Sequence, residues 1–122
     1  MDSLKQPVPV VTFNDVERIA HREFSDEQFS TVINLLKEYG TEAWQRECSR
    51  VQLAALKLAD GSLEKLRAQI ETAKRDYRDV LASAEFPAYC KVGFRHIREL
   101  PVDERLRIIN ADWHQYDEWL RK

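Results

Sequence analysis

The sequence lacks the features that mark membrane, secreted or disulfide-stabilised proteins. No stretch approaches the roughly 20 consecutive apolar residues that cross a bilayer. The chain does not begin with a basic segment followed by a long apolar one. Its two cysteines, Cys48 and Cys90, are too far apart in sequence for a C-x-x-C metal pair and are expected to be free thiols. We therefore predict a cytoplasmic protein with no membrane partner.

Glycine and proline are also scarce, and neither sign of charge dominates. The 122 residues include only three glycines and four prolines, beside abundant Leu, Ala, Glu, Arg and Lys, and this composition favours helices over a sheet. The formal net charge is -2, so no overall basic field favours nucleic acid or an anionic membrane. A chain of this length fits one domain with one core. We predict an all-α, single-domain bundle of about five helices.

The stretch 51–81 is predicted to form a central helical hairpin. Its first part, residues 51–59, is nearly all apolar, and a helix that is apolar on more than one side is a buried one. Its second part is amphipathic, with apolar residues at spacings of three and four and charged residues opposite them. Gly61 suits the left-handed position that ends the first helix, and Ser62 is suited to cap the second.

Parts of this hairpin resemble a family of small uncharacterised bacterial proteins. The resemblance lies in residues 51–59, in Gly61-Ser62-Leu63-Glu64-Lys65-Leu66 and in residues 73–82, all within residues 51–87. It implies a bacterial source and a helical fold. It implies no activity and carries no functional residue to this chain.

Prolines and capping signals place the segments before the hairpin. Pro7 and Pro9 stand between valines, which favours an extended N-terminal arm over residues 1–11 and places the helical domain at residues 12–122. Three further signals predict helix starts: Thr12 or Asn14, Ser25 with Gln28 three residues later, and Thr41, whose helix would run on into the hairpin with Trp44 on its apolar stripe.

Prolines also divide the segment after the hairpin. Pro87 is predicted to end the second hairpin helix, before an irregular region at residues 88–94 and a short helical turn at residues 95–100. Pro101 suits the first turn of a strongly amphipathic last helix. Whether a pocket forms around residues 86–97 is left open by the sequence.

The last helix carries a second stripe beside its core-facing one. Large aromatic residues are favoured at interface hot spots, so this stripe predicts a docking surface for a second copy of the chain or for another bacterial protein. The alternative is that a neighbouring helix or the arm covers the stripe. We predict a non-enzymatic protein-interaction or adaptor module whose partner-binding residues are Ile108, Asp112, Gln115 and Trp119.

Residues 91–107 support an alternative function. Basic side chains near Tyr89 and Phe94 are what single-stranded nucleic acid or a phosphate ligand needs, the charges for phosphate and the rings for stacking. Acidic residues dilute this patch, and an acidic stretch at residues 12–47 offers a pairing partner within the fold or between subunits. The residues predicted for this role are Lys91, Arg95, Arg98 and Arg105.

Motifs for catalysis or cofactor binding are weak. Glu17 and His21, four residues apart, suit a metal or a shared proton but equally an ordinary helix surface. Asp76 is more readily a partner for an arginine of a neighbouring helix than a catalytic acid, and Cys90 has only His96 nearby as a base. A small metal-dependent enzyme remains a second alternative. We predict no catalytic, cofactor or metal residue.

Overall fold

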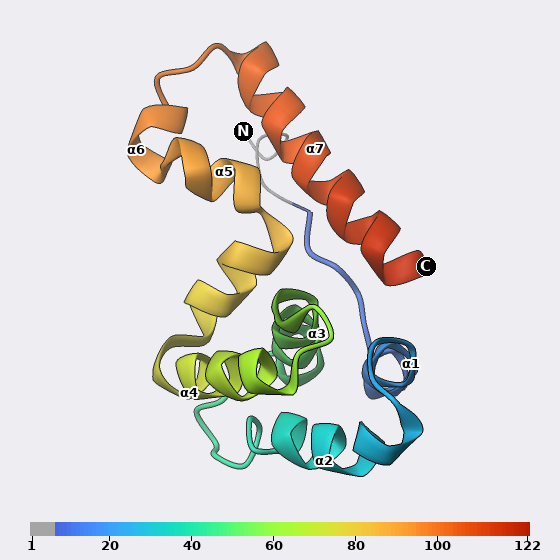
Figure 1. The fold of residues 1–122 in the computed structure, drawn as a ribbon. Coiled ribbons are helices and arrows are strands. Elements are labelled where there is room, and N and C mark those ends of the chain that lie inside the picture. The colour runs from blue at the N-terminus through green and yellow to red at the C-terminus, as the bar shows by residue number, and fades with distance from the viewer. Residues whose placement is uncertain (1–6) are drawn as a thin grey trace.

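A computed structural model describes residues 7–122, and these residues form helices and connections without strands (Figure 1). The all-α prediction is confirmed, but this part of the chain has seven helices, not about five. None of these helices is both long and apolar enough to cross a bilayer. The helices are α1 (Phe13–Glu23), α2 (Asp26–Lys37), α3 (Cys48–Ala59), α4 (Leu63–Glu85), α5 (Pro87–Val92), α6 (Phe94–Ile97) and α7 (Val102–Arg121).

Helix α3 lies at the centre of the molecule, as its composition predicts. Its largest interface is with α4, and its other main contact is with α1. Leu53 and Leu56, which point away from the main apolar stripe, are both fully buried, and each such burial contributes roughly 1.5–3 kcal/mol. The hairpin turn is also as predicted: Gly61 has φ 78°, and the Lys65 amide donates to Ser62 Oγ over 3.2 Å.

Local side-chain caps define the start of the first two helices. The Thr12 amide donates to the Asp15 carboxylate over 3.0 Å at the start of α1. At α2 the Gln28 amide donates to Ser25 Oγ over 3.3 Å, and the Gln28 side chain reaches back to the Ser25 amide. Both caps satisfy amides that a helix start leaves without partners, so the predictions at Thr12 and Ser25 are confirmed.

The prediction of a helix start at Thr41 is wrong, because residues 38–47 form a connection held by side-chain hydrogen bonds. Gln45 accepts from the amides of Gly40 and Glu42, at 2.6 and 3.0 Å, and is itself buried. With these amides satisfied outside a helix, α3 begins only at Cys48. Trp44 is consequently 52% exposed and does not lie on a core stripe.

The buried Tyr39 makes stability depend on pH in alkaline solution. Its hydroxyl donates to the Arg46 carbonyl over 2.8 Å, and burial raises the pKa of Tyr39 to about 12, whereas an unfolded tyrosine has a pKa of about 10. Between these values the unfolded chain has lost the proton and the native state keeps it. The free energy of unfolding is therefore expected to fall as pH rises from about 10 to 12. Urea titrations across this range measure the fall.

A Tyr39→Phe variant is the comparison for this prediction. Its free energy of unfolding is expected to fall less steeply over the same pH range, because the titrating hydroxyl is gone. Burial also raises the pKa of Tyr116, so part of the alkaline loss is expected to remain. An unchanged slope in the variant contradicts the assignment to Tyr39.

Helix α4 is bent at Asp76. This residue has non-helical angles, φ -155° and ψ 97°, within the 23-residue helix. Its carboxylate accepts from the Arg78 amide and from Arg78 Nε, both at 3.1 Å, which caps the second half of α4 as an N-cap residue does. Asp76 thus pairs within its own helix, not with an arginine of a neighbouring one. Beyond the bend, α4 turns away from α2 and leads to α5 and α6 (Figure 1).

The region after Pro87 is more regular than predicted. Helix α5 begins at Pro87 and α6 at Phe94, and Gly93 separates them with φ 98°. Helices of six and four residues show no usable period in the sequence. The region predicted to be irregular is therefore largely α5, whereas α6 overlaps the predicted short helical turn at residues 95–100. These two short helices account for the two extra elements of the fold.

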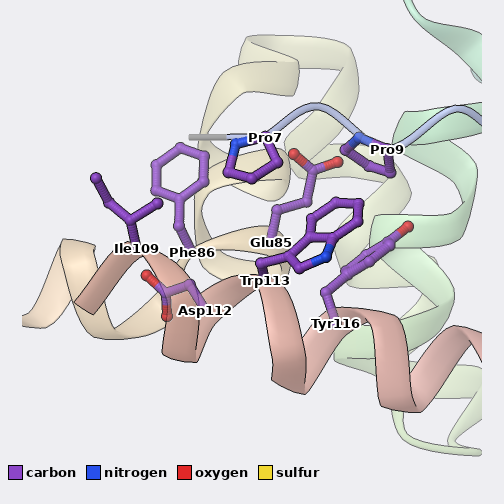
Figure 2. Close-up of a pocket in the computed structure, with 8 residues that line it drawn as sticks. All are labelled: Pro7, Pro9, Glu85, Phe86, Ile109, Asp112, Trp113 and Tyr116. Atoms are coloured by element: carbon purple, nitrogen blue, oxygen red, sulfur yellow. The ribbon is translucent and has the colours of Figure 1, made fainter. Parts of the chain in front are cut away.

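The described part of the arm, residues 7–11, is extended (Figure 1), and Pro7 and Pro9 line a small cavity together with residues of α7. Residues 1–6 of the predicted arm lie outside the described residues. Pro9 is buried, whereas Val8 and Val10 are 58% and 96% exposed. Figure 2 shows the arm prolines beside the side chains at the α4–α5 junction and on α7. A cavity of only about 10 Å³ remains there, lined by Pro7, Pro9, Glu85, Phe86, Ile109, Asp112, Trp113 and Tyr116.

Candidate docking groove

An open groove of about 610 Å³ lies on one side of the bend in α4. The start of α3 borders it, and the second half of α4 and the short helices beyond form the rest of its wall. Of residues 86–97, where the sequence left a pocket open, only Phe86 and Phe94 line this groove. We call it the docking groove; its lining residues are Glu47, Arg50, Asp76, Tyr77, Arg78, Asp79, Leu81, Ala82, Phe86 and Phe94.

Three aromatic rings hold α5 and α6 together beside the docking groove. The centroids of Phe86 and Tyr89 are 6.0 Å apart, those of Phe86 and Phe94 6.4 Å, and those of Tyr89 and Phe94 5.3 Å. These separations fall in the range of favourable aromatic pairs. Phe94 nevertheless stays 54% exposed. The cluster therefore fixes an aromatic ring at the edge of the groove with about half of its surface open to solvent.

An ion pair between Arg50, which lines the docking groove, and the buried Glu85 stabilises the groove wall. Arg50 donates to Glu85 through Nε and Nη2, over 2.7 and 2.6 Å. Glu85 is only 6% exposed, and its hydrogen bonds raise the pKa of Arg50 against the effect of burial. A two-point pair of this kind fixes both side chains in orientation, so the start of α3 is tied to the end of α4. A signal for this pair is present in the sequence: Arg50 stands in the first turn of a largely apolar helix, where a partly buried arginine needs a partner.

The groove rim carries charge of both signs. Asp76 pairs with Arg78 at 3.1 Å, and this hydrogen bond lowers the pKa of Asp76. Glu47 is exposed, with φ 55°, and its nearest cation is Arg50 at 4.0 Å. Asp79 is also exposed and makes no ion pair with another residue of the described chain. Within the described residues, Asp79 therefore has no ion pair, and Glu47 has only the long contact to Arg50, which Glu85 already engages through two shorter hydrogen bonds.

Two residues of the predicted partner-binding stripe hold the fold together. Asp112 is 2% exposed and accepts from the amides of Ala88 and Tyr89, at 2.8 and 3.0 Å, which caps α5. Gln115 donates to the carbonyls of Ala84 and Asp112, at 3.2 and 2.9 Å. Their polar groups face the α4–α5 junction. The stripe that a helical wheel placed outside the core is thus covered there by α4 and α5.

The aromatic end of the stripe is covered by α1. Arg22 lies over the Trp119 ring, 5.2 Å from its centroid, and donates to the Trp119 carbonyl over 2.7 Å. Arg18 donates to the next carbonyl, that of Leu120, over 2.8 Å. Trp119 and Ile108 are both partly buried. The structure therefore places Trp119 at the contact between α7 and α1, which is the second of the two alternatives for this stripe.

The predicted basic residues are not all equally accessible. Lys91, Arg95 and Arg98 are exposed, whereas Arg105 is partly buried. The neighbouring His96 lies 3.5 Å from the Glu99 carboxylate. Lys91, Arg95 and Arg98 therefore lie on the surface of the segment that also carries Phe94. Arg105 is less exposed than these three residues.

The residues weighed for catalysis and metal binding are engaged in other contacts. The His21 ring stacks on Phe29, with centroids 3.7 Å apart and planes 9° apart. Burial raises the pKa of Cys90, whereas an activated thiol needs a lowered one. Within residues 7–122 no three metal-ligating side chains lie together. The docking groove is therefore the feature of the described chain from which a function is best argued.

Comparison of the chain with protein-family models, curated protein sequences and solved structures finds no match. The resemblance to small bacterial proteins stays a prediction. The evidence for a role of the docking groove comes from its own residues.

Proposed function

We propose that the protein is a non-enzymatic interaction module that binds a segment of another protein in the docking groove. One observation carries this proposal: Phe94 is held 54% exposed at the edge of an open groove of about 610 Å³ that Tyr77, Leu81 and Phe86 also line. An exposed aromatic ring beside an apolar wall, within a polar rim, is the composition of a protein-binding hot spot.

The supports of the groove suit it to recognition. The Arg50–Glu85 pair ties the start of α3 to the end of α4, and the bend at Asp76 directs the second half of α4 along the groove wall. A site whose shape exists before binding loses less entropy on binding. We place the docking contact at Phe94 and not at Trp119, because Arg22 of α1 already covers the Trp119 ring.

A different protein fits the groove better than a second copy of this chain. Closed dimers form around a two-fold axis, where each surface meets its own image. A two-fold contact centred on the docking groove would place one hollow against another. A partner with a projecting apolar side chain fills the hollow instead.

Native mass spectrometry tests the proposal, on protein purified gently from its source cells. The wild-type chain is expected in a stoichiometric protein complex. A Phe94→Ser variant is expected to lose that complex while keeping its overall helix content, with any loosening confined to α5 and α6, where Phe94 contacts Phe86 and Tyr89. Trp44→Ser is the matched control, because Trp44 is 52% exposed on a surface away from the groove lining. A wild-type chain without a protein partner, or a complex that survives in Phe94→Ser, contradicts the proposal.

Binding of nucleic acid or a phosphate ligand is the second candidate. It is favoured by the exposure of Lys91, Arg95 and Arg98 on the segment that carries Phe94. Such binding weakens steeply as salt rises, and single-stranded oligonucleotides titrated at low and high salt measure this. A replacement of the three cations by Gln is expected to abolish the binding, and no binding at low salt removes the candidate.

A further inference from the structure

We infer that the segment bound in the docking groove carries an apolar side chain flanked by Lys or Arg. This inference rests on the proposed docking function and adds the chemistry of the partner. It is carried by the charges that remain around the groove after its internal ion pairs are formed, together with the apolar wall of the groove.

The charges on the groove lining do not cancel. Three carboxylates and two guanidinium groups line it. Arg50 is engaged by Glu85 through two hydrogen bonds, and Arg78 is engaged by Asp76. Both cations are therefore occupied within the fold. The carboxylates of Glu47 and Asp79 remain, and a basic partner complements them.

The two remaining carboxylates come from different elements. Glu47 stands directly before α3, and Asp79 lies in the second half of α4. Both are exposed. A partner in the groove meets negative charge from two elements, which attracts basic segments and repels acidic ones at the encounter.

The groove lining also includes an apolar wall. Tyr77, Leu81 and Phe86 line the groove, and Phe94 stands at its edge. A large apolar side chain removes this surface from water on binding. Lysine and arginine have apolar stems that lie along such a wall while their charged ends reach a carboxylate. Apolar and basic residues side by side on one segment therefore satisfy both features.

The exposed cations of the chain do not remove this preference. Lys91, Arg95 and Arg98 are outside the groove lining, although Arg95 follows Phe94 directly in sequence. Among the charged side chains that line the groove, Glu47 and Asp79 are the ones that no short internal ion pair engages within the described residues.

The test uses a set of synthetic amphipathic peptides that share one leucine pattern and differ only in the flanking residue: Lys, Gln or Glu. Isothermal titration calorimetry measures their affinity for the wild-type protein. The Lys peptide is expected to bind about 2- to 30-fold more tightly than the Gln peptide, the range for two exposed ion pairs, and the Glu peptide is expected to bind more weakly than the Gln peptide.

Two double variants identify the origin of the preference. In E47Q/D79N the advantage of the Lys peptide over the Gln peptide is expected to disappear. E27Q/E64Q changes the net charge equally at exposed positions outside the groove lining and is expected to keep the advantage. An advantage that persists in E47Q/D79N, or that is also lost in E27Q/E64Q, overturns the inference.

Failure of the inference is distinguishable from failure of the docking function. If the Lys and Gln peptides bind equally and both lose affinity in Phe94→Ser, the groove binds apolar segments without the charge preference, and only the inference is overturned. If no peptide binds, or if binding is the same in Phe94→Ser, both proposals are overturned.

Discussion

Replacement of Arg50 by alanine is expected to lower the free energy of unfolding by about 3–5 kcal/mol, because it leaves the Glu85 carboxylate buried without its cation. Glu85 is 6% exposed and accepts both of its short hydrogen bonds from Arg50. The pair joins the first turn of α3 to the last turn of α4, 35 residues away. Urea denaturation at neutral pH measures the loss.

The double variant R50M/E85M separates the cost of an unpaired charge from the value of the pair. It removes both charges and fills the site with apolar side chains, so its loss is expected to be much smaller than that of Arg50→Ala. Arg121→Ala is the control for removing an arginine from an exposed ion pair, here with Asp117 at 2.8 Å, and is expected to cost under about 0.5 kcal/mol. Equal losses in Arg50→Ala and Arg121→Ala contradict the prediction.

Replacement of Asp112 by alanine is expected to lower the free energy of unfolding by about 2–4 kcal/mol, because two hydrogen bonds to a buried carboxylate are lost together. These bonds satisfy the amides of Ala88 and Tyr89 in the first turn of α5. The short helix has no other side-chain cap. Chemical denaturation measures the overall loss, and hydrogen exchange at these two amides is expected to accelerate.

The effect of Asp112→Ala is expected to extend to the docking groove. Helix α5 leads directly into α6, which carries Phe94. A loosened α5 therefore no longer fixes the exposed ring, and peptide affinity is expected to fall. Asp117→Ala is the matched control on the same helix, since within residues 7–122 the side chain of Asp117 pairs with the exposed Arg121 alone. Unchanged exchange at Ala88 and Tyr89 in Asp112→Ala contradicts the role of this cap.

The sequence draws attention to two lining residues of the docking groove, but not to the groove itself. The sequence singled out Phe94 as an aromatic among basic residues, and Asp76 as a carboxylate that needs an arginine. It did not predict that they share one site, because Asp76 and Phe94 are 18 positions apart and line the same groove only after α4 bends. That bend is a departure from helical angles at a single residue, within a pattern that is periodic on both sides.

The features of the fold that the sequence predicts correctly depend on interactions between residues close together in the chain. The buried α3, the turn at Gly61 and the caps at Ser25 and Ser62 depend on side chains within four residues of one another or on the period of one helix. Such interactions form in any context that keeps the helix. They fix the class of the fold, the position of its core and the amphipathic character of its last helix.

The tertiary structure alone decided how the polar residues are used. Asp112 caps a helix 24 residues away, Arg50 meets a glutamate 35 residues away and Arg22 covers a tryptophan 97 residues away. A helical wheel shows which side of a helix a residue occupies but not which element packs there. These partners are selected only when the elements pack, since burial makes an unpaired charge or amide costly. For this reason Asp112, Gln115 and Trp119 of the predicted docking stripe make contacts within the fold, and the exposed aromatic surface lies at Phe94 instead.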